Sequence, residues 1–135
     1  MTDVAIVDGW PPNRAELVEA FHPEPGTVFA WDGTVYVPGL GDRQLPPDLI
    51  AHERVHFAQQ AAVGGPEAWW RLYIDDPEFR LEQEVEAYRA QWKILMRRPK
   101  RERFARLYAI TCDLGGPMYG NLVTPARARA LITAA

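Results

Sequence analysis

The chain has little cysteine, no long apolar run and no N-terminal targeting pattern. Cys112 is the single cysteine among 135 residues, so no disulfide can form within the chain, and we expect this residue to be buried as a small apolar side chain. The first residues, MTDVAIVDGW, lack the basic start and apolar stretch of a signal peptide. No stretch reaches the roughly 20 apolar residues that span a bilayer. We therefore expect a cytoplasmic protein, or one carried within a larger assembly such as a virion.

The chain also lacks a strong excess of charge of either sign. Fifteen basic and 18 acidic residues give a formal net charge of -3, so we expect neither a nucleic acid nor a membrane as a partner. Six basic residues do gather in one short run: Arg97, Arg98, Lys100, Arg101, Arg103 and Arg106. Such a run is typical of a solvated helix start, and a binding patch is the alternative.

The spacing of proline and glycine predicts one α+β domain over residues 1–135, with a small N-terminal hairpin or sheet followed by a helix-dominated part. Asp32-Gly33 separates two runs rich in β-branched and aromatic residues, which predicts a β-hairpin. Prolines in the first turn predict the helix starts that follow. The expected strands are 4–7, 27–31 and 34–38, the expected helices are 13–21, 48–63, 66–74, 77–96, 99–114 and 125–133, and 115–121 is expected to be a loop.

Histidine is scarce as well, yet two of the three histidines lie four positions apart in the stretch LIAHERVHFAQQ. On an α-helix, residues i and i+4 share one face. His52 and His56 can therefore each direct an imidazole nitrogen at one Zn²⁺ ion, about 2.0–2.1 Å away. Glu53 directly follows the first histidine, where its carboxylate can act as a general base on a water held by the metal.

The apolar residues of this helix lie on several faces, which predicts a helix that is buried nearly all round. Two histidines and a glutamate are costly to bury there unless they find partners. A metal ion is one such partner. Core histidines bonded to main-chain carbonyls are the alternative, but they account neither for the spacing nor for Glu53. Gln59, one turn after His56 on the same face, is placed to bond the outer nitrogen of a ligand or a main-chain group.

A catalytic zinc site usually has a third protein ligand, and helical geometry favours Glu84. This residue lies at the edge of the apolar stripe of helix 77–96, whereas Glu82 and Glu86 fall on its charged face. We expect Glu84 to turn inward and to bind the metal, with Glu86 as the alternative ligand. Three solvated acids with nearby basic partners are the structural alternative. His22 is expected to be a surface or capping residue.

These motifs resemble those of the gluzincin group of zinc metallopeptidases. The resemblance rests on His52-Glu53-x-x-His56 and on the later E-x-E-A-Y segment, which is similar to the E-x-x-A-D pattern of that group. Tyr88 stands where the group has an acid that orients a histidine. From about residue 28 onward the chain also resembles very small metallopeptidase-like proteins of bacteriophages and bacteria, through Gln59, Gln60 and the loop MYGNLVTP.

The resemblance implies a minimal zincin-like domain with one zinc ion on His52, His56 and Glu84, with Glu53 as general base and a peptide or protein as substrate. The second strand of the hairpin is then a candidate to pair with an extended substrate, and an ordinary structural hairpin is the alternative. A tyrosine hydroxyl often stabilises the oxyanion in such sites. Tyr119 is the candidate, and Tyr88 and Tyr108 are the alternatives. Two other functions stay open: a zincin-fold structural or binding component of a phage or bacterial assembly with little catalysis, and a helical adaptor without metal.

Overall fold

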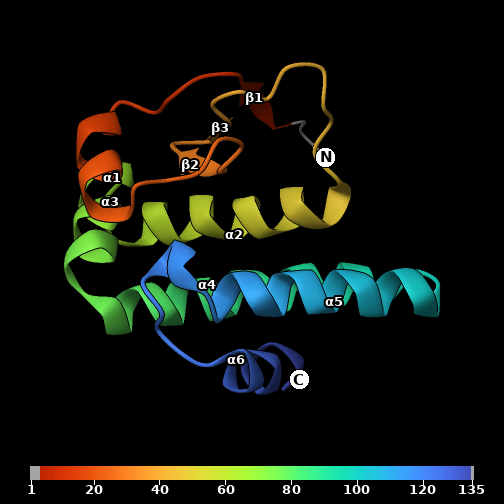
Figure 1. Cartoon of the computed structure of the whole chain (residues 1–135). Helices are drawn as coiled ribbons and strands as arrows, with labels where there is room; N and C mark the ends of the chain where they lie inside the picture. The colour runs from red at the N-terminus through yellow and green to blue at the C-terminus, as the bar shows by residue number, and fades with distance from the viewer. Residues whose placement is uncertain (1–3, 135) are drawn as a thin grey trace.

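Proline sets the start of most helices in this chain. The computed structural model describes residues 4–134, and its α+β fold agrees with the prediction (Figure 1). Pro47, Pro66, Pro77 and Pro125 each occupy the first helical turn, where a missing N–H costs nothing. The helices are α1 (Arg14–Phe21), α2 (Pro47–Ala62), α3 (Pro66–Asp75), α4 (Pro77–Leu95), α5 (Lys100–Leu114) and α6 (Pro125–Thr133).

The Asp32-Gly33 turn forms the predicted hairpin, because both residues adopt positive φ (47° and 83°), as a two-residue hairpin turn requires. The strands are β1 (Ala5–Val7), β2 (Phe29–Trp31) and β3 (Thr34–Tyr36). β3 lies in the centre of the sheet, antiparallel to β2 and parallel to β1.

The expectation that the second strand of the hairpin pairs with a substrate is therefore wrong. β3 has strand neighbours on both sides, so its hydrogen-bonding groups are used within the sheet. β2 is the edge strand on that side. One outward group of β2 is already engaged, because the Ala30 carbonyl accepts hydrogen bonds from Gln60 Nε2 (2.8 Å) and Trp70 Nε1 (2.9 Å).

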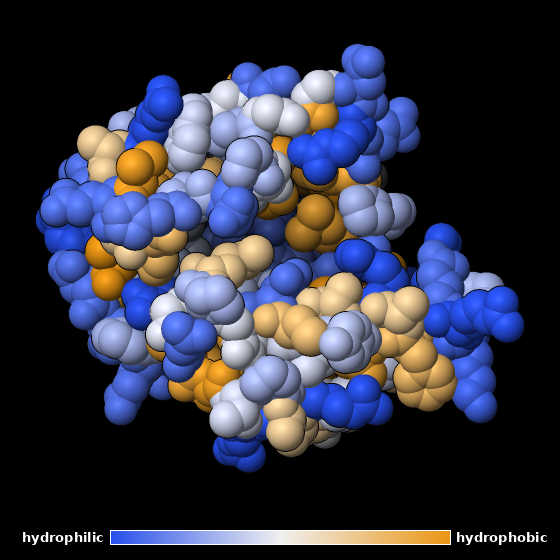
Figure 2. All heavy atoms as spheres, viewed as in Figure 1, coloured by the Kyte–Doolittle hydropathy of each residue, from blue (hydrophilic) through white to orange (hydrophobic). Residues whose placement is uncertain are grey.

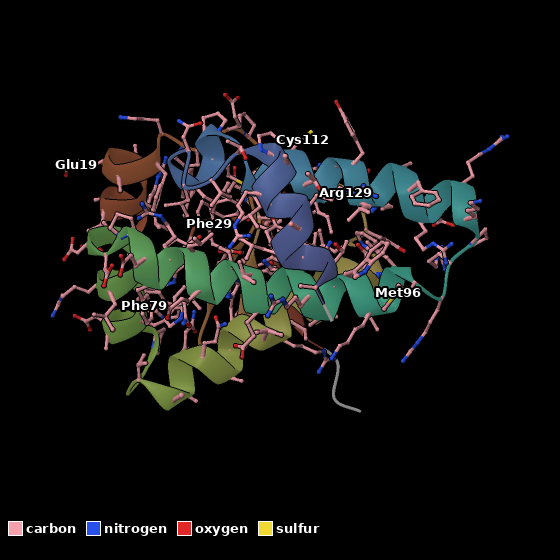
Figure 3. All side chains as sticks on the ribbon, turned by 90° about the horizontal axis from the view of Figure 1, so that it is seen from below. Glu19, Phe29, Phe79, Met96, Cys112 and Arg129 are labelled. Carbon is pink, nitrogen blue, oxygen red and sulfur yellow. The ribbon has the colours of Figure 1, made fainter. Side chains whose placement is uncertain are left out.

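Helix α2 lies between the small sheet on one side and the α4–α5 layer on the other, and α6 crosses the far side of that layer (Figures 1 and 3). Two apolar clusters hold these layers together. One joins α1, β2 and α3 and contains Leu17, Phe29, Trp69, Trp70 and Tyr73. The other joins α4, α5 and α6 and contains Val85, Tyr88, Leu95, Leu107, Ile110, Leu114, Ala128 and Ile132.

Two local expectations differ from the structure. The segment predicted as a loop at 115–121 contains a short 3-10 helix, η1 (Pro117–Tyr119), which the proline-led turn initiates. Cys112 was expected to be buried but is exposed (Figure 3), because the buried face of α5 carries Leu107, Ile110 and Leu114 and not this position. None of the helices in the described part of the chain combines the length and apolar character needed to cross a bilayer.

Candidate metal centre

Helix α2 buries polar residues and leaves its apolar residues half-buried or exposed. Its buried residues are Asp48, His52, Glu53, His56, Gln59 and Gln60. The prediction of a helix buried nearly all round is therefore wrong, since Leu49, Val55 and Phe57 are only partly covered. This face packs against α4, which contributes the buried Glu84 and Gln91. Polar groups shut away from water must find partners, so the α2–α4 interface is where a bound ion or a hydrogen-bond network is required.

The two imidazoles and one carboxylate of this interface converge on a single point. His52 Nε2 and His56 Nε2 are 3.2 Å apart. Glu84 Oε1 lies 3.0 Å from His52 Nε2, and Glu84 Oε2 lies 3.3 Å from His56 Nε2. Ligands placed tetrahedrally about 2.0–2.1 Å from a zinc ion are separated by about 3.3 Å. The spacing of these three side chains therefore matches that of zinc ligands.

Glu53 adjoins the same histidines at a longer distance. Its Oε2 atom lies 3.8 Å from His52 Nε2, and one atom each of His52, Glu53 and His56 lie within 4.8 Å of one another. These three residues form a group that can hold a metal ion. Proximity alone would count Glu53 as a ligand, but the oxygens of Glu84 are nearer to both imidazoles. Burial raises the pKa of the Glu53 carboxyl, as suits a group that exchanges a proton.

The outer nitrogen of His52 is fixed by a chain of hydrogen bonds. Gln91 Nε2 donates to the Asp48 carboxylate (2.8 Å), so the Gln91 amide oxygen faces His52 Nδ1 at 2.9 Å. An amide oxygen can only accept, so Nδ1 carries a proton, and Nε2 is the nitrogen that can bind a metal ion. Arg106 on α5 also donates to Asp48, at 2.8 Å.

The outer nitrogen of His56 is held in the same way by Gln59, which confirms the prediction made for that glutamine. Gln59 Nε2 donates to the Gln83 main-chain oxygen (3.0 Å) and to Glu86 Oε1 (2.7 Å). Its amide oxygen therefore accepts from His56 Nδ1, at 2.8 Å. Both Nδ1 atoms are thus donors, and both Nε2 atoms point inward, toward the carboxylate of Glu84.

The acidic residues of α4 lie as the helical geometry predicts. Glu84 is buried, with only 3% of its surface exposed, whereas Glu82 and Glu86 are exposed. Tyr73 on α3 donates its hydroxyl to Glu84 Oε2 at 2.5 Å. Burial alone would raise the pKa of Glu84, but the charges and hydrogen bonds of His56 and His52 hold it well below its usual range. Glu84 is therefore an anion at neutral pH.

Of the three candidate tyrosines, Tyr88 lies beside His52 and Tyr119 contacts Tyr88. The hydroxyls of Tyr88 and Tyr119 are 2.6 Å apart, and the Tyr88 ring packs edge-on against His52. Burial raises the pKa of both phenols well above the ordinary value, so both keep their protons and one of the two protons is free for another acceptor. Arg80 fixes this loop by donating to the main-chain oxygen of Tyr119, at 3.0 Å. Tyr108 is 71% exposed and lies outside the cavity.

A cavity of about 530 Å³ opens on this centre. Its walls come from the segment between α1 and β2, from α2, and from α5 and η1, and they include Phe21, Val28, Phe29, Trp70, Met118 and Tyr119. Figure 2 shows the same face of the molecule hollowed across its middle. His22 also lines the cavity but is exposed and ends α1 in a left-handed conformation (φ 46°), as expected for a surface or capping residue.

No family model, curated protein or solved structure matches this chain. The resemblance based on the sequence motifs therefore stays a prediction, and the chemistry of the centre must be argued from its own geometry.

Sequence reasoning missed several residues that support the histidines. Gln91 and Asp48 complete the hydrogen bonds behind His52, and Tyr73 holds Glu84. A signal for the first two was present, because Asp48 lies four residues before His52 and Gln91 lies seven after Glu84, both helical spacings. Tyr73 has no such signal, since α3 meets α4 only in the folded chain. The side chain that bonds the outer nitrogen of His52 is Gln91, whereas Tyr88 packs against the His52 ring.

Proposed function

We propose that this protein is a zinc-dependent metallopeptidase of minimal size. In this proposal His52, His56 and Glu84 hold one zinc ion, Glu53 is the general base, and the substrate is a peptide or protein. The observation that supports it best is the inward convergence of two imidazole Nε2 atoms and one carboxylate at zinc-ligand spacing. Groups of this kind repel one another unless a cation lies among them.

A simple core of bonded histidines explains this arrangement less well. Such histidines would donate their inner nitrogens to main-chain carbonyls, whereas here each inner nitrogen faces another histidine and a carboxylate. The two outer nitrogens are both committed as donors to glutamine oxygens. A metal-bound histidine usually donates its outer N–H to a protein acceptor in this way, which fixes the orientation of its ring.

The residues around the centre can divide the work of peptide hydrolysis. A zinc ion held by His52, His56 and Glu84 would supply a Lewis acid that lowers the pKa of a water molecule to about 7. Glu53 accepts the proton of the attacking water and then delivers it to the leaving amine. Tyr119, through the hydroxyl pair with Tyr88, donates a hydrogen bond to the oxygen on which negative charge develops. The apolar walls of the cavity hold the peptide and exclude water.

The experiment that tests this function combines metal analysis with one substitution. Purified protein should contain about one equivalent of zinc. Glu53→Gln should keep the zinc and the fold but lower the rate of peptide cleavage by about 10²–10⁴-fold, because it removes the base and not a ligand. Metal-free protein after gentle purification would end the proposal, and so would a Glu53→Gln variant with unchanged cleavage.

A non-catalytic zincin-fold component of a larger assembly is the second candidate. The observation that favours it is the depth of the centre, since His52, Glu53 and His56 are each no more than 4% exposed. A structural metal site needs no access for a substrate, whereas a catalytic one keeps a position open. The same measurement separates the two functions, because this candidate predicts bound zinc but no cleavage in either the wild-type protein or Glu53→Gln.

A further inference from the structure

The basic run between positions 97 and 106 lies at a projecting end of the molecule. α4 turns into α5 there, and this end reaches beyond the start of α2 (Figure 1). Two of its six cations are engaged, since Arg98 pairs with Glu102 and Arg106 with Asp48, both at 2.8 Å. Arg97, Lys100, Arg101 and Arg103 have no carboxylate within 4.0 Å among residues 4–134.

Two exposed apolar side chains accompany these four cations. Met96, at the end of α4, and Phe104, in α5, are each 45% exposed. Lys100 Nζ lies 5.9 Å and Arg103 Cζ 5.6 Å from the centre of the Phe104 ring, so both cations lie over the ring. We call the group Met96, Arg97, Lys100, Arg101, Arg103 and Phe104 the basic tip. Single exposed apolar residues are ordinary, but here both lie next to a basic residue, since Arg103 Nη1 also donates to the Met96 main-chain oxygen at 3.4 Å.

Although the net charge of the whole chain does not predict a membrane partner, we propose that the basic tip docks on an anionic lipid surface, with Phe104 and Met96 entering the interface and the four cations facing lipid phosphates. Basic residues are attracted to such a surface and exposed apolar side chains partition into it. Residues 97–106 carry six basic residues and one acidic residue in a chain of net charge -3, so the rest of the chain is strongly acidic. A projecting tip lets the cations touch the surface while the acidic remainder stays away from it.

A nucleic acid fits the same surface less well. Proteins that bind single strands combine a basic groove with several aromatic rings whose faces stack on bases. The basic tip has one aromatic ring, and Lys100 and Arg103 already lie over it. It is also an apex and not a groove, as the hydrophilic projection in Figure 2 shows.

Vesicle co-sedimentation of the full chain tests this inference without any need for bound metal. The probes are vesicles of phosphatidylcholine alone and of phosphatidylcholine with phosphatidylserine. Each basic residue near such a surface contributes about fivefold in binding, so Lys100→Glu with Arg101→Glu should weaken binding to anionic vesicles at least ~25-fold. Both changes fall in the first turn of α5, where acidic residues favour the helix dipole, so the fold should be retained.

Arg127→Glu with Arg129→Glu is the matched control, because it makes the same change in charge on α6. Helix α6 lies away from the basic tip, as the separate positions of Arg129 and Met96 in Figure 3 show. The control should bind nearly as the wild type does. Phe104→Ala should cost roughly fivefold even at high salt, since its contribution is apolar.

The proposal is supported if anionic vesicles bind, neutral vesicles do not, and only the tip variants lose affinity. It is overturned if no vesicle binds, if control and tip variants weaken equally, or if a single-stranded oligonucleotide binds where vesicles fail. A protein without zinc that still binds vesicles would remove the proposed function and leave this inference standing.

Discussion

Helix α4 has two faces that are stabilised in different ways. Toward α5 and α6 it buries Val85 and Leu95 in an apolar cluster. Toward α2 it buries Glu84 and Gln91 against His52 and its neighbours. The first face needs nothing but close packing, because each buried apolar side chain contributes about 1.5–3 kcal/mol. The second stabilises the fold only while every polar group has a partner, since an unpaired one costs about 1–3 kcal/mol.

The two faces differ in that only the polar face of α4 needs a bound cation. On the polar face the outer atoms are satisfied by glutamines, but the inner Nε2 atoms and the Glu84 carboxylate face one another. Either a metal ion or an extra proton must lie among them. An apolar interface of the same size would stabilise the chain without this condition, so the polar face is explained by what it binds.

The largest effect should come from the metal ion itself. Zinc at about 1,000 times its dissociation constant should stabilise the protein by about 4 kcal/mol and raise the Tm by roughly 10–20 °C. Glu84→Gln should lose most of this gain, because it replaces an anionic ligand by a neutral amide. Thermal unfolding with zinc and with a chelator measures both.

Two neighbours on α4 serve as controls for this measurement. Glu82→Gln changes an exposed acid and should keep the full response to zinc. Glu86→Gln should keep most of it, because Glu86 bonds Gln59 and not an imidazole. If Glu86→Gln abolished the response and Glu84→Gln did not, the assignment of the third ligand would be wrong.

Leu107→Ala should destabilise only the apolar interface of α4 with α5 and α6. Leu107 is fully buried between α4, α5 and α6, and removing such a side chain costs about 2–5 kcal/mol. The increment in stability produced by zinc should nevertheless stay the same, because the space left by the Leu107 side chain lies on the side of α4 that faces away from the metal centre. Chemical unfolding with and without zinc gives both numbers. A zinc increment that fell together with the basal stability would mean that the two faces are not independent.

Most of the fold could be predicted because its signals are local. The prolines at 47, 66, 77 and 125 and the turn at Asp32-Gly33 predict where elements start and reverse. The sheet order could not be predicted in this way. β1 pairs with β3 across the intervening α1 and β2, and strand pairing over such a separation depends on tertiary packing. The prediction that the second hairpin strand pairs with a substrate was wrong because the pairing of β1 with β3 could not be predicted.

The candidate site was predictable to the extent that it lies on helical spacing. His52, Glu53 and His56 share a motif, and the inward position of Glu84 follows from its angle on the helix. The polar character of the buried face of α2 did not follow, because apolar residues on several faces suggested burial all round. Periodicity measures where apolar residues lie. It does not reveal that a helix turns its ionisable side inward to meet a partner helix.

Gln91→Met tests whether the hydrogen bond behind His52 contributes to metal affinity. It removes the oxygen that accepts from His52 Nδ1 while keeping the size of the side chain. Loss of such a partner usually lowers metal affinity about 10–100-fold, which competition with a chromogenic chelator can measure. Gln60→Met is the matched control, since Gln60 is equally buried on α2 but bonds Ala30 and Asp32. It should lower stability and leave metal affinity unchanged, and equal losses of affinity in both variants would contradict a specific role for Gln91.

The smallest effect should appear as a pH dependence of the metal-free protein. Burial alone would lower the pKa of His56, but the charge and hydrogen bond of Glu84 raise it from 6.5 to about 9. A group with a raised pKa in the folded state contributes stability that is complete below about pH 6.5 and is lost as the pH rises through about 9. In the presence of a chelator, urea unfolding should therefore show a loss on the order of 1 kcal/mol between neutral and alkaline pH.

This pH dependence should come from the polar face of α4 alone, because His56 and Glu84 cause it. Glu84→Gln removes the carboxylate that holds the proton on His56, so its stability should change little over the same range. Zinc should flatten the trend in the wild type, because the ion takes the place of that proton and binds better as the imidazole loses it. Leu107→Ala should keep the slope of the wild type at a lower stability. A metal-free protein that gained stability from neutral to alkaline pH would show that no proton lies among the inner nitrogens and Glu84.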